Sequence, residues 1–266
     1  MNLRHIQNMT VEKDGTTLDC VIFGTGSKPL ILIPGLSFQR VKGAALPLAY
    51  MYRLFSKEYT VYVIDKKEHI PAGYTIREMA DDTAFVMGRL NLCAASVFGV
   101  SQGGMIAQYL AIHYPHLVNK LVLGVTASRQ NEVITEAISG WIKLAEQRDY
   151  EAFVIDMLKK MYSAAYIKKY GWLFPILSKV GKPKDFDRFI ALAQACLTCD
   201  SYPELHKITC PVFVIGGKQD RVVTGRASEE IAEALNCGIY MYDSLGHAAY
   251  DEAPDFNKRI YQFLCE

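Results

Sequence analysis

The sequence predicts an α/β fold with a mostly parallel central sheet, helices on both faces of that sheet, and an inserted helical lid. Two observations predict it. Short apolar runs that fit buried strands alternate with helix-like segments between residues 30 and 124, and this alternation stops and then resumes at residue 212. Strands that alternate with helices favour parallel pairing through right-handed crossovers. The 266 residues, half of them apolar, suffice for one such domain with an insertion.

The first strands are expected to be antiparallel, because Asp14-Gly15 between them is a hairpin turn signal. The next strand is a fully apolar run that ends at Pro34-Gly35, as expected of a buried parallel strand. The alternation continues from there. The strands expected in this half are 9–13, 16–23, 30–33, 59–64, 95–98 and 120–124, and the helices are 47–55, 75–90 and 102–114.

The middle of the chain is rich in helix formers and contains no clear strand. Gly171 and Gly181-Lys182-Pro183 are expected to break its helices. We therefore expect an α/β core built from residues 1–128 and 204–266, with the lid at 129–203 on the carboxyl edge of the sheet. The helices expected in the lid are 131–147, 149–162 and 185–197; strands 212–215 and 239–242 and helices 225–235 and 254–264 complete the core.

Composition and charge argue against several classes of function. The net charge is +1 and no long run of one sign occurs, so neither a nucleic-acid surface nor a polybasic membrane anchor is expected. The first ten residues are polar, and no apolar stretch approaches the length of a membrane span. A cytoplasmic protein that contacts neither nucleic acid nor membrane is the prediction.

The seven cysteines are scattered and mostly lie in apolar segments, as reduced core residues do. Cys196-Leu197-Thr198-Cys199 has the spacing of a redox or zinc site. A zinc site needs further ligands, and no second pair or convincing histidine accompanies this one. No metal site is therefore expected.

The pentapeptide Gly99-Val100-Ser101-Gln102-Gly103 is the motif with the most chemical content. It lies between an expected strand and an expected helix, where Gly-x-Ser-x-Gly is typical of a sharp turn that exposes a nucleophilic serine. The helix that follows directs amide N–H groups at developing negative charge. The alternative is a glycine-rich turn in which the serine only caps the helix. Ser101 is the candidate nucleophile.

A serine hydroxyl needs a base to remove its proton, and the base needs an acid to orient it. Among six histidines, His247 is the candidate base because it follows the last expected strand, at the edge where open α/β sheets build their sites. Asp220 follows the preceding strand in the same way. Residues 125–128, after the strand before that, cannot ionise. The alternatives are an ordinary loop histidine and an exposed turn aspartate.

Two backbone amides are the candidates for an oxyanion hole, the pair of donors that stabilises negative charge on the reacting oxygen. One is the N–H of Gln102, directly after the candidate nucleophile. The other is the N–H of Leu36, in the turn after the first parallel strand, where Gly35 permits a sharp bend.

Together these features resemble the α/β-hydrolase fold superfamily, in its capped branch of esterase-like serine hydrolases. The resemblance runs from about residue 16 to the C-terminus, and the chain order of serine, aspartate and histidine is that of the superfamily. Relatives usually carry His-Gly in place of Pro34-Gly35, and often Arg-Gly two residues beyond the equivalent of Asp65. Here Lys66-Lys67-Glu68-His69-Ile70 stands instead, so a different loop shape is expected. The matching segments are Pro34-Gly35-Leu36, Asp65, 74–76 with 81–82, 99–104, 217–220 and Gly246-His247.

The resemblance implies cleavage of small to medium apolar esters through an acyl-enzyme on Ser101, with no cofactor. A lid rich in aromatic and methionine side chains predicts a largely apolar pocket. Thioesterase, lactonase, C–C bond hydrolase or acyltransferase activity with the same three residues stays open, as does a non-catalytic small-molecule receptor on this fold. The expected partner is a small-molecule substrate, and a homodimer is left open. The candidate substrate-binding residues are Trp141, Met157, Met161 and Tyr162.

Overall fold

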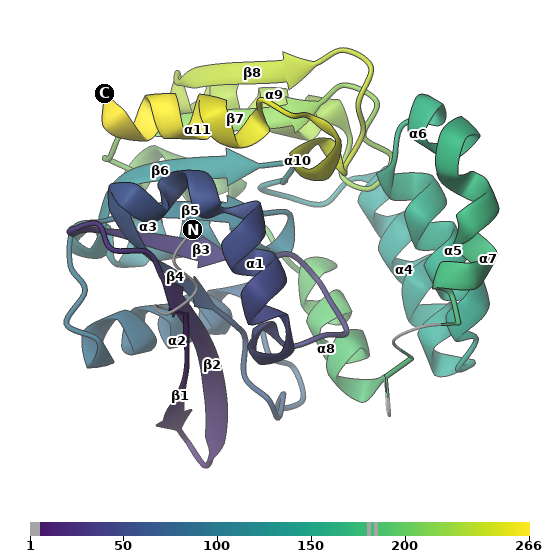
Figure 1. Cartoon of the computed structure of the whole chain (residues 1–266), viewed down its shortest axis with the longest axis horizontal. Helices are drawn as coiled ribbons and strands as arrows, with labels where there is room; N and C mark the ends of the chain where they lie inside the picture. Colours follow the sequence, from purple (N-terminus) through teal and green to yellow (C-terminus); the bar gives the residue numbers. More distant parts are fainter. Residues whose placement is uncertain (1–5, 180–181, 184–185) are drawn as a thin grey trace.

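A mixed sheet runs through the computed structural model, which describes residues 6–179, 182–183 and 186–266. The strand order in the described residues is β1-β2-β4-β3-β5-β6-β7-β8 (Figure 1). β1 pairs antiparallel with β2, β2 pairs antiparallel with β4, and all later pairs are parallel. The expected fold class and its antiparallel start are confirmed. The strands are β1 (Gln7–Lys13), β2 (Thr16–Phe23), β3 (Lys28–Ile33), β4 (Tyr59–Ile64), β5 (Ala95–Val100), β6 (Val118–Gly124), β7 (Val212–Gly217) and β8 (Gly238–Tyr242).

Helices cover both faces of the sheet because the parallel strands are apolar on both sides. Along β3, Ile31 and Ile33 pack into one buried cluster, whereas Leu30 and Leu32 pack into the other. This is the two-residue alternation of a strand. The first cluster includes residues of α2 (Ile76–Arg89), α3 (Gln102–His113) and α9 (Gly225–Leu235). The second includes residues of α1 (Ala45–Met51), α10 (Ala249–Glu252) and α11 (Phe256–Cys265).

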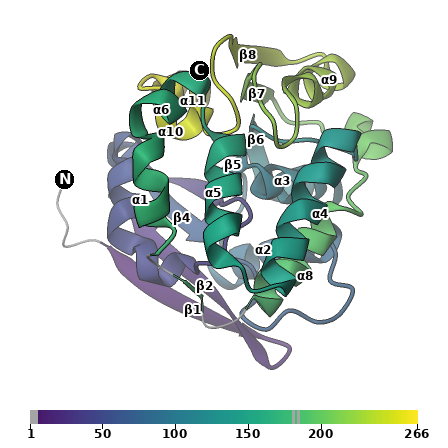
Figure 2. The ribbon, with the colours of Figure 1, turned by 90° about the vertical axis from the view of Figure 1, so that its right-hand side faces the viewer.

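The segment between β6 and β7 is helical in the residues that the structure describes. These helices lie together beyond the carboxyl ends of the parallel strands (Figures 1 and 2). Asn131, Asp149 and Ser163 each accept a hydrogen bond from a first-turn amide, so side-chain caps begin three of the helices. The helices are α4 (Glu132–Glu146), α5 (Tyr150–Met161), α6 (Ala164–Tyr170), α7 (Phe174–Leu177) and α8 (Asp187–Cys196).

Several expected boundaries differ from the structure. The helix expected at 47–55 is three short pieces: a 3₁₀ turn at Val41–Ala44, α1, and a 3₁₀ turn at Arg53–Lys57. Pro47 lies within the first turn of α1, where its missing N–H has no partner to lose. The sequence analysis did not find α6 and α7, whose lengths of seven and four residues give little periodicity to detect.

Two expectations for the lid fall partly on undescribed positions. The helix expected at 185–197 begins at Asp187, and residue 185 lies outside the described residues. Of the expected break at 181–183, residue 181 also lies outside them. Gly171 ends α6 and begins a 3₁₀ turn, as expected of a break. Among the helices of the described residues, none has both the length and the apolar character that a membrane crossing requires.

Candidate active site

Ser101 occupies a sharp turn between the end of β5 and the start of α3. Its backbone has φ 53° and ψ −121°, a conformation that residues other than glycine rarely adopt. The neighbouring glycines make this turn sterically possible. A Cβ added at Gly103 would lie 1.9 Å from the carbonyl oxygen of Ile33, and one added at Gly99 would lie 2.3 Å from that of Gly103.

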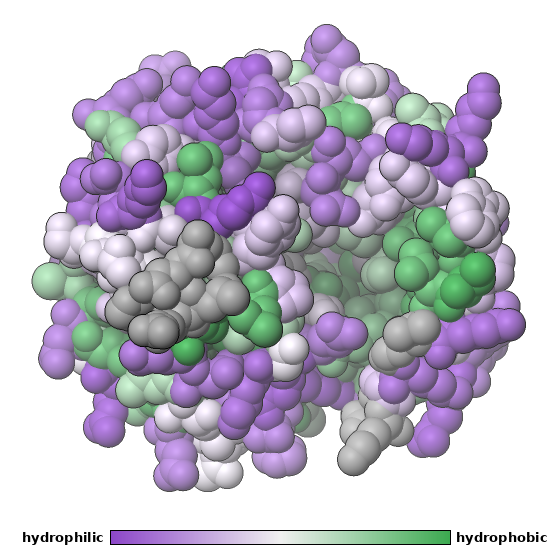
Figure 3. Space-filling model, in the orientation of Figure 1, coloured by the Kyte–Doolittle hydropathy of each residue, from purple (hydrophilic) through white to green (hydrophobic). Residues whose placement is uncertain are grey.

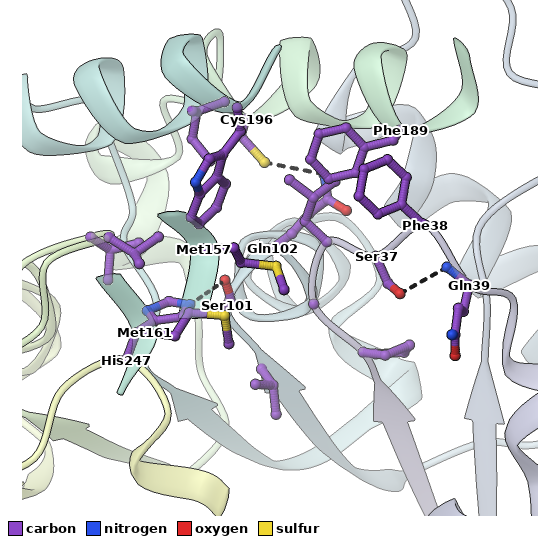
Figure 4. A pocket seen from close by; sticks show the side chains of 18 of the residues that line it. Ser37, Phe38, Gln39, Ser101, Gln102, Met157, Met161, Phe189, Cys196 and His247 are labelled. Carbon is purple, nitrogen blue, oxygen red and sulfur yellow. Dashed lines mark hydrogen bonds between the residues drawn. The ribbon is translucent and has the colours of Figure 1, made fainter. Parts of the chain in front are cut away.

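The three side chains proposed for catalysis lie in one hydrogen-bonded chain. His247 Nε2 is 2.9 Å from Ser101 Oγ, as the dashed line in Figure 4 marks. His247 Nδ1 is 2.8 Å from Asp220 Oδ2. The side chains of His247 and Asp220 are only 5% and 2% exposed, so this contact is shielded from water. Residues far apart in the sequence thus meet at the carboxyl ends of β5, β7 and β8.

The hydrogen bonds of Asp220 determine how the imidazole can act. Asp220 Oδ1 accepts the amides of Val222 at 2.7 Å and Val223 at 2.9 Å, which fixes the carboxylate. An ionised carboxylate can only accept hydrogen bonds, so Nδ1 of His247 carries the hydrogen between them. Nε2 is then left with a lone pair directed at the Ser101 hydroxyl. This is the arrangement that a general base requires.

The end of α5 is hydrogen-bonded to the loops that carry His247 and Asp220. The amide of Ala248 donates to the carbonyl of Met161 at 2.8 Å, next to the histidine. On the other side of the site, Arg221 donates to the carbonyl of Tyr162 at 3.1 Å. The last turn of α5 is therefore fastened both beside the histidine and beside the aspartate.

The two candidate amide donors border the same space as Ser101. Leu36 and Gln102 both line the cavity above the serine. Gln102 is the first residue of α3, where backbone N–H groups have no partner within the helix. Its side chain is held elsewhere, because Nε2 donates to the carbonyl of Leu192 at 2.6 Å and contacts Cys196 Sγ at 3.1 Å.

A cavity of about 420 Å³ lies above Ser101, between α1 and the lid helices. The space-filling view shows the surface hollowed between these elements (Figure 3). Its lining is mainly apolar, and the polar groups of Ser101 and His247 lie among apolar side chains. Among the lining residues, the helices between β6 and β7 contribute Ile134, Ile138, Trp141, Val154, Met157 and Met161.

Three of the four lid residues expected to bind substrate line this cavity, but Tyr162 does not. Its hydroxyl donates to Asp251 at 2.6 Å, and its ring stacks on Tyr166 with the centroids 4.1 Å apart. The reason is that α5 ends at Met161, and Tyr162 has extended backbone. Met157 and Met161 are four residues apart and share one helix face, which Tyr162 does not. The placement of Tyr162 at the substrate was wrong.

The sequence analysis missed an aromatic wall opposite the lid methionines. Phe38 and Phe189 both line the cavity and stack with their centroids 4.2 Å apart (Figure 4). Phe38 comes from the loop after β3, two residues beyond Leu36, and Phe189 comes from α8. The position of Phe38, two residues beyond the predicted oxyanion donor Leu36, was a sequence signal that could have identified it.

Metal ligands do not gather in the described part of the chain, where no group of three or more His, Cys, Asp or Glu side chains could hold an ion. Cys196 and Cys199 are both buried as free thiols, and burial raises the pKa of each to about 12. Thiols that stay protonated are poor ligands and poor nucleophiles.

The known proteins to which this chain is similar include lactonases and an esterase. The model of a family described as the alpha/beta hydrolase family matches residues 30–256. The chain is 24% identical over 266 residues to 3-oxoadipate enol-lactonase 2 of Acinetobacter baylyi, covering 98% of this chain and 97% of that protein. A solved enol-lactonase from Burkholderia xenovorans superposes with a TM-score of 0.83 at 23% identity, covering 97% and 100% of the two chains. A thermophilic esterase from Thermogutta terrifontis gives 0.78 at 21%, covering 97% and 98%.

The close approach at Gly103 predicts a large loss of stability on Gly103→Ala. The added methyl would meet backbone, which cannot move aside, so we expect a loss of about 3 kcal/mol or more in the free energy of unfolding. Gly140→Ala in α4 is the matched control. A Cβ there meets nothing within 4 Å, so a gain of about 0.5–1 kcal/mol is expected. Urea denaturation measures both, and equal stability of the two variants would contradict the packing described.

Proposed function

This chain belongs to the alpha/beta hydrolase family, and from that premise we propose that it is a serine hydrolase acting through an acyl-enzyme on Ser101. The observation that carries the proposal is the buried chain of hydrogen bonds from Asp220 through His247 to Ser101, which ends in an apolar cavity. A serine that only capped α3 would not need a base at 2.9 Å, and it makes no side-chain cap contact to the helix.

The proposed reaction has two halves. Ser101 Oγ attacks the carbonyl carbon of the ester while His247 Nε2 takes its proton, and the carbonyl oxygen becomes an oxyanion facing the amides of Leu36 and Gln102. The bond to the leaving alcohol then breaks as His247 returns the proton to it. A water molecule, deprotonated by the same nitrogen, attacks the acyl-enzyme, and the acid is released as His247 returns this proton to Ser101 Oγ. Each oxyanion donor typically contributes about 10²–10³ in kcat.

The substrate class follows from the size and character of the cavity. About 420 Å³ of mainly apolar space suits a small or medium ester with an apolar acyl or alcohol part. A lactone, which is a cyclic ester, is the second candidate, favoured by the relative named 3-oxoadipate enol-lactonase 2. The same residues serve both, and comparison of kcat/KM for a lactone and an open-chain ester of equal carbon number ranks them.

Labelling with a fluorophosphonate tests the nucleophile. We expect stoichiometric modification of the wild type and none of Ser101→Ala, whose turnover of p-nitrophenyl butyrate falls at least ~10⁴-fold because no acyl-enzyme forms. Ser37→Ala is the control, since Ser37 lines the same cavity but lies outside the hydrogen-bonded chain. Absence of labelling and of turnover in the wild type would instead favour a small-molecule receptor.

Asp220→Asn tests the orientation of the base. An asparagine can donate its amide to Nδ1, which would place the hydrogen on Nε2 and remove the lone pair that Ser101 needs. We expect kcat to fall by about 10³–10⁴-fold with little change in KM. Asp243→Asn, an exposed aspartate paired with Lys218, is the control and keeps wild-type kinetics. A twofold effect at Asp220 would refute the assigned role.

The corrected lining makes a further prediction about chain length. Met157→Ala enlarges the cavity, so the ratio of kcat/KM for longer over shorter acyl p-nitrophenyl esters rises several-fold. Tyr162→Phe removes a hydroxyl that bonds to Asp251 outside the cavity, so that ratio stays unchanged. A changed ratio in Tyr162→Phe with an unchanged ratio in Met157→Ala would instead indicate that Tyr162 contacts the substrate.

A further inference from the structure

We propose that Lys66 is a positioning residue that holds the loop after β3 so that the Leu36 amide faces the reacting oxygen. The proposal rests on the serine hydrolase function proposed above. Lys66 touches no reacting atom, and it acts through the backbone of the loop that presents this amide.

Both hydrogen bonds of the Lys66 side chain go to the turn that precedes Leu36. Lys66 follows β4 by two residues, and its Nζ donates to the carbonyl of Pro34 and, at 2.8 Å, to the carbonyl of Gly35. Gly35 in turn lies against the candidate nucleophile, since a Cβ added to it would be 3.3 Å from Ser101 Cβ. One side chain thus holds two consecutive carbonyls directly beside the site.

Because a peptide unit is planar, the contact of Lys66 with the Gly35 carbonyl also determines the direction of the Leu36 N–H. The carbonyl of Gly35 and the N–H of Leu36 belong to the same planar peptide, and in a trans peptide they point in opposite directions. A cation that holds the carbonyl on its own side therefore directs the N–H to the other side. Leu36 borders the cavity above Ser101, which is the side left for its amide. The positive charge also lies at the carbonyl end of the dipole that is to stabilise an oxyanion.

Burial of the Lys66 ammonium costs desolvation free energy, and no carboxylate of the described residues forms an ion pair with it. The residue is 4% exposed, and desolvation lowers its pKa to about 8. The neighbouring Asp65 carboxylate is occupied by Arg188 at 3.2 Å, by the amide of Val41 at 3.0 Å and by the Lys66 amide at 2.8 Å.

The charged and titratable groups that face Lys66 come from two directions. Asp65, beside it in the chain, favours its charged form, whereas Arg188 of α8 opposes it. Cys196 of α8 is also near, but its pKa of about 12 keeps the thiol neutral at pH 8. Arg40 and Lys66 both line a small pocket beside Pro34 and Gly35. The guanidinium of Arg40 pairs with Asp19. With a pKa of about 8, Lys66 loses its charge as pH rises through that value, and its ammonium faces the carbonyl side of the turn that carries Leu36.

Lys66→Met is the decisive variant, because methionine has a similar length but neither donates nor carries charge. With p-nitrophenyl butyrate as the probe, we expect kcat to fall about 10- to 100-fold, part of the effect of losing a donor, with KM within twofold. Lys67→Met is the matched control. Lys67 is the next residue in the same loop, and its Nζ lies 3.2 Å from Asp82. We expect kcat of this variant to stay within twofold of the wild type.

The pH profile separates positioning from simple packing. In the wild type, kcat should fall as pH rises through about 8, because Lys66 loses its charge there. Lys66→Met and Lys66→Gln should lack this alkaline limb. Gln can donate an uncharged hydrogen bond, so its kcat should lie between those of the wild type and Met, and it carries the test if Met does not fold.

Each outcome decides the proposal. The role of Lys66 is overturned if kcat of Lys66→Met, or of Lys66→Gln where Met does not fold, stays within threefold of the wild type. It is also overturned if the defect lies only in KM or Tm, or if the pH profile superimposes on that of the wild type. Failure of the wild type to react with a fluorophosphonate or to turn over the ester is a different result, because it refutes the serine hydrolase function itself.

Discussion

The close approach of α3 to the sheet is the constraint on which the site depends. Gly103 lies against the carbonyl of Ile33, and Gly104 lies against Thr126, with a built Cβ only 2.6 Å from that side chain. The start of α3 is thereby wedged between the loops that follow β3 and β6. Thr126 also donates to the carbonyl of Ser101 at 2.7 Å. The serine is held in an unfavourable conformation because its neighbours leave no other, and the remaining groups are arranged around its oxygen.

The helices between β6 and β7 line the cavity and are also hydrogen-bonded to the segments that carry the site residues. α5 ends on the backbone beside His247, and α8 receives the side chain of Gln102 through the carbonyl of Leu192. Arg188 of α8 reaches Asp65, which follows β4 beside the turn that carries Leu36. The helices that determine the shape of the pocket thus also determine the geometry of the groups beneath it. A change in α8 is therefore expected to affect reactivity and substrate choice together.

Local signals predicted most of the core. Strands 16–23 and 59–64 and helix 225–235 have the expected bounds, because a hairpin turn, apolar runs and Gly or Asn at the ends fix them. The order of Ser101, Asp220 and His247 follows from strand ends that share one edge of the sheet. Tyr162 could not be placed this way, since its direction depends on where α5 stops and on Asp251, 89 residues away. The stacking of Phe38 on Phe189 could not be predicted either, because the two rings lie far apart in the sequence.

Lys66 shows where sequence reasoning ends and coordinates become necessary. The run of polar residues after Asp65 departs from the pattern of relatives, which indicated a different loop but no purpose for it. The purpose depends on two carbonyls more than thirty residues earlier, brought close by the parallel pairing of β3 with β4. An apolar residue at this buried position would avoid desolvation of an ammonium and would be expected to favour stability. A local conflict with stability of this kind is expected where geometry at a site matters more than the free energy of folding.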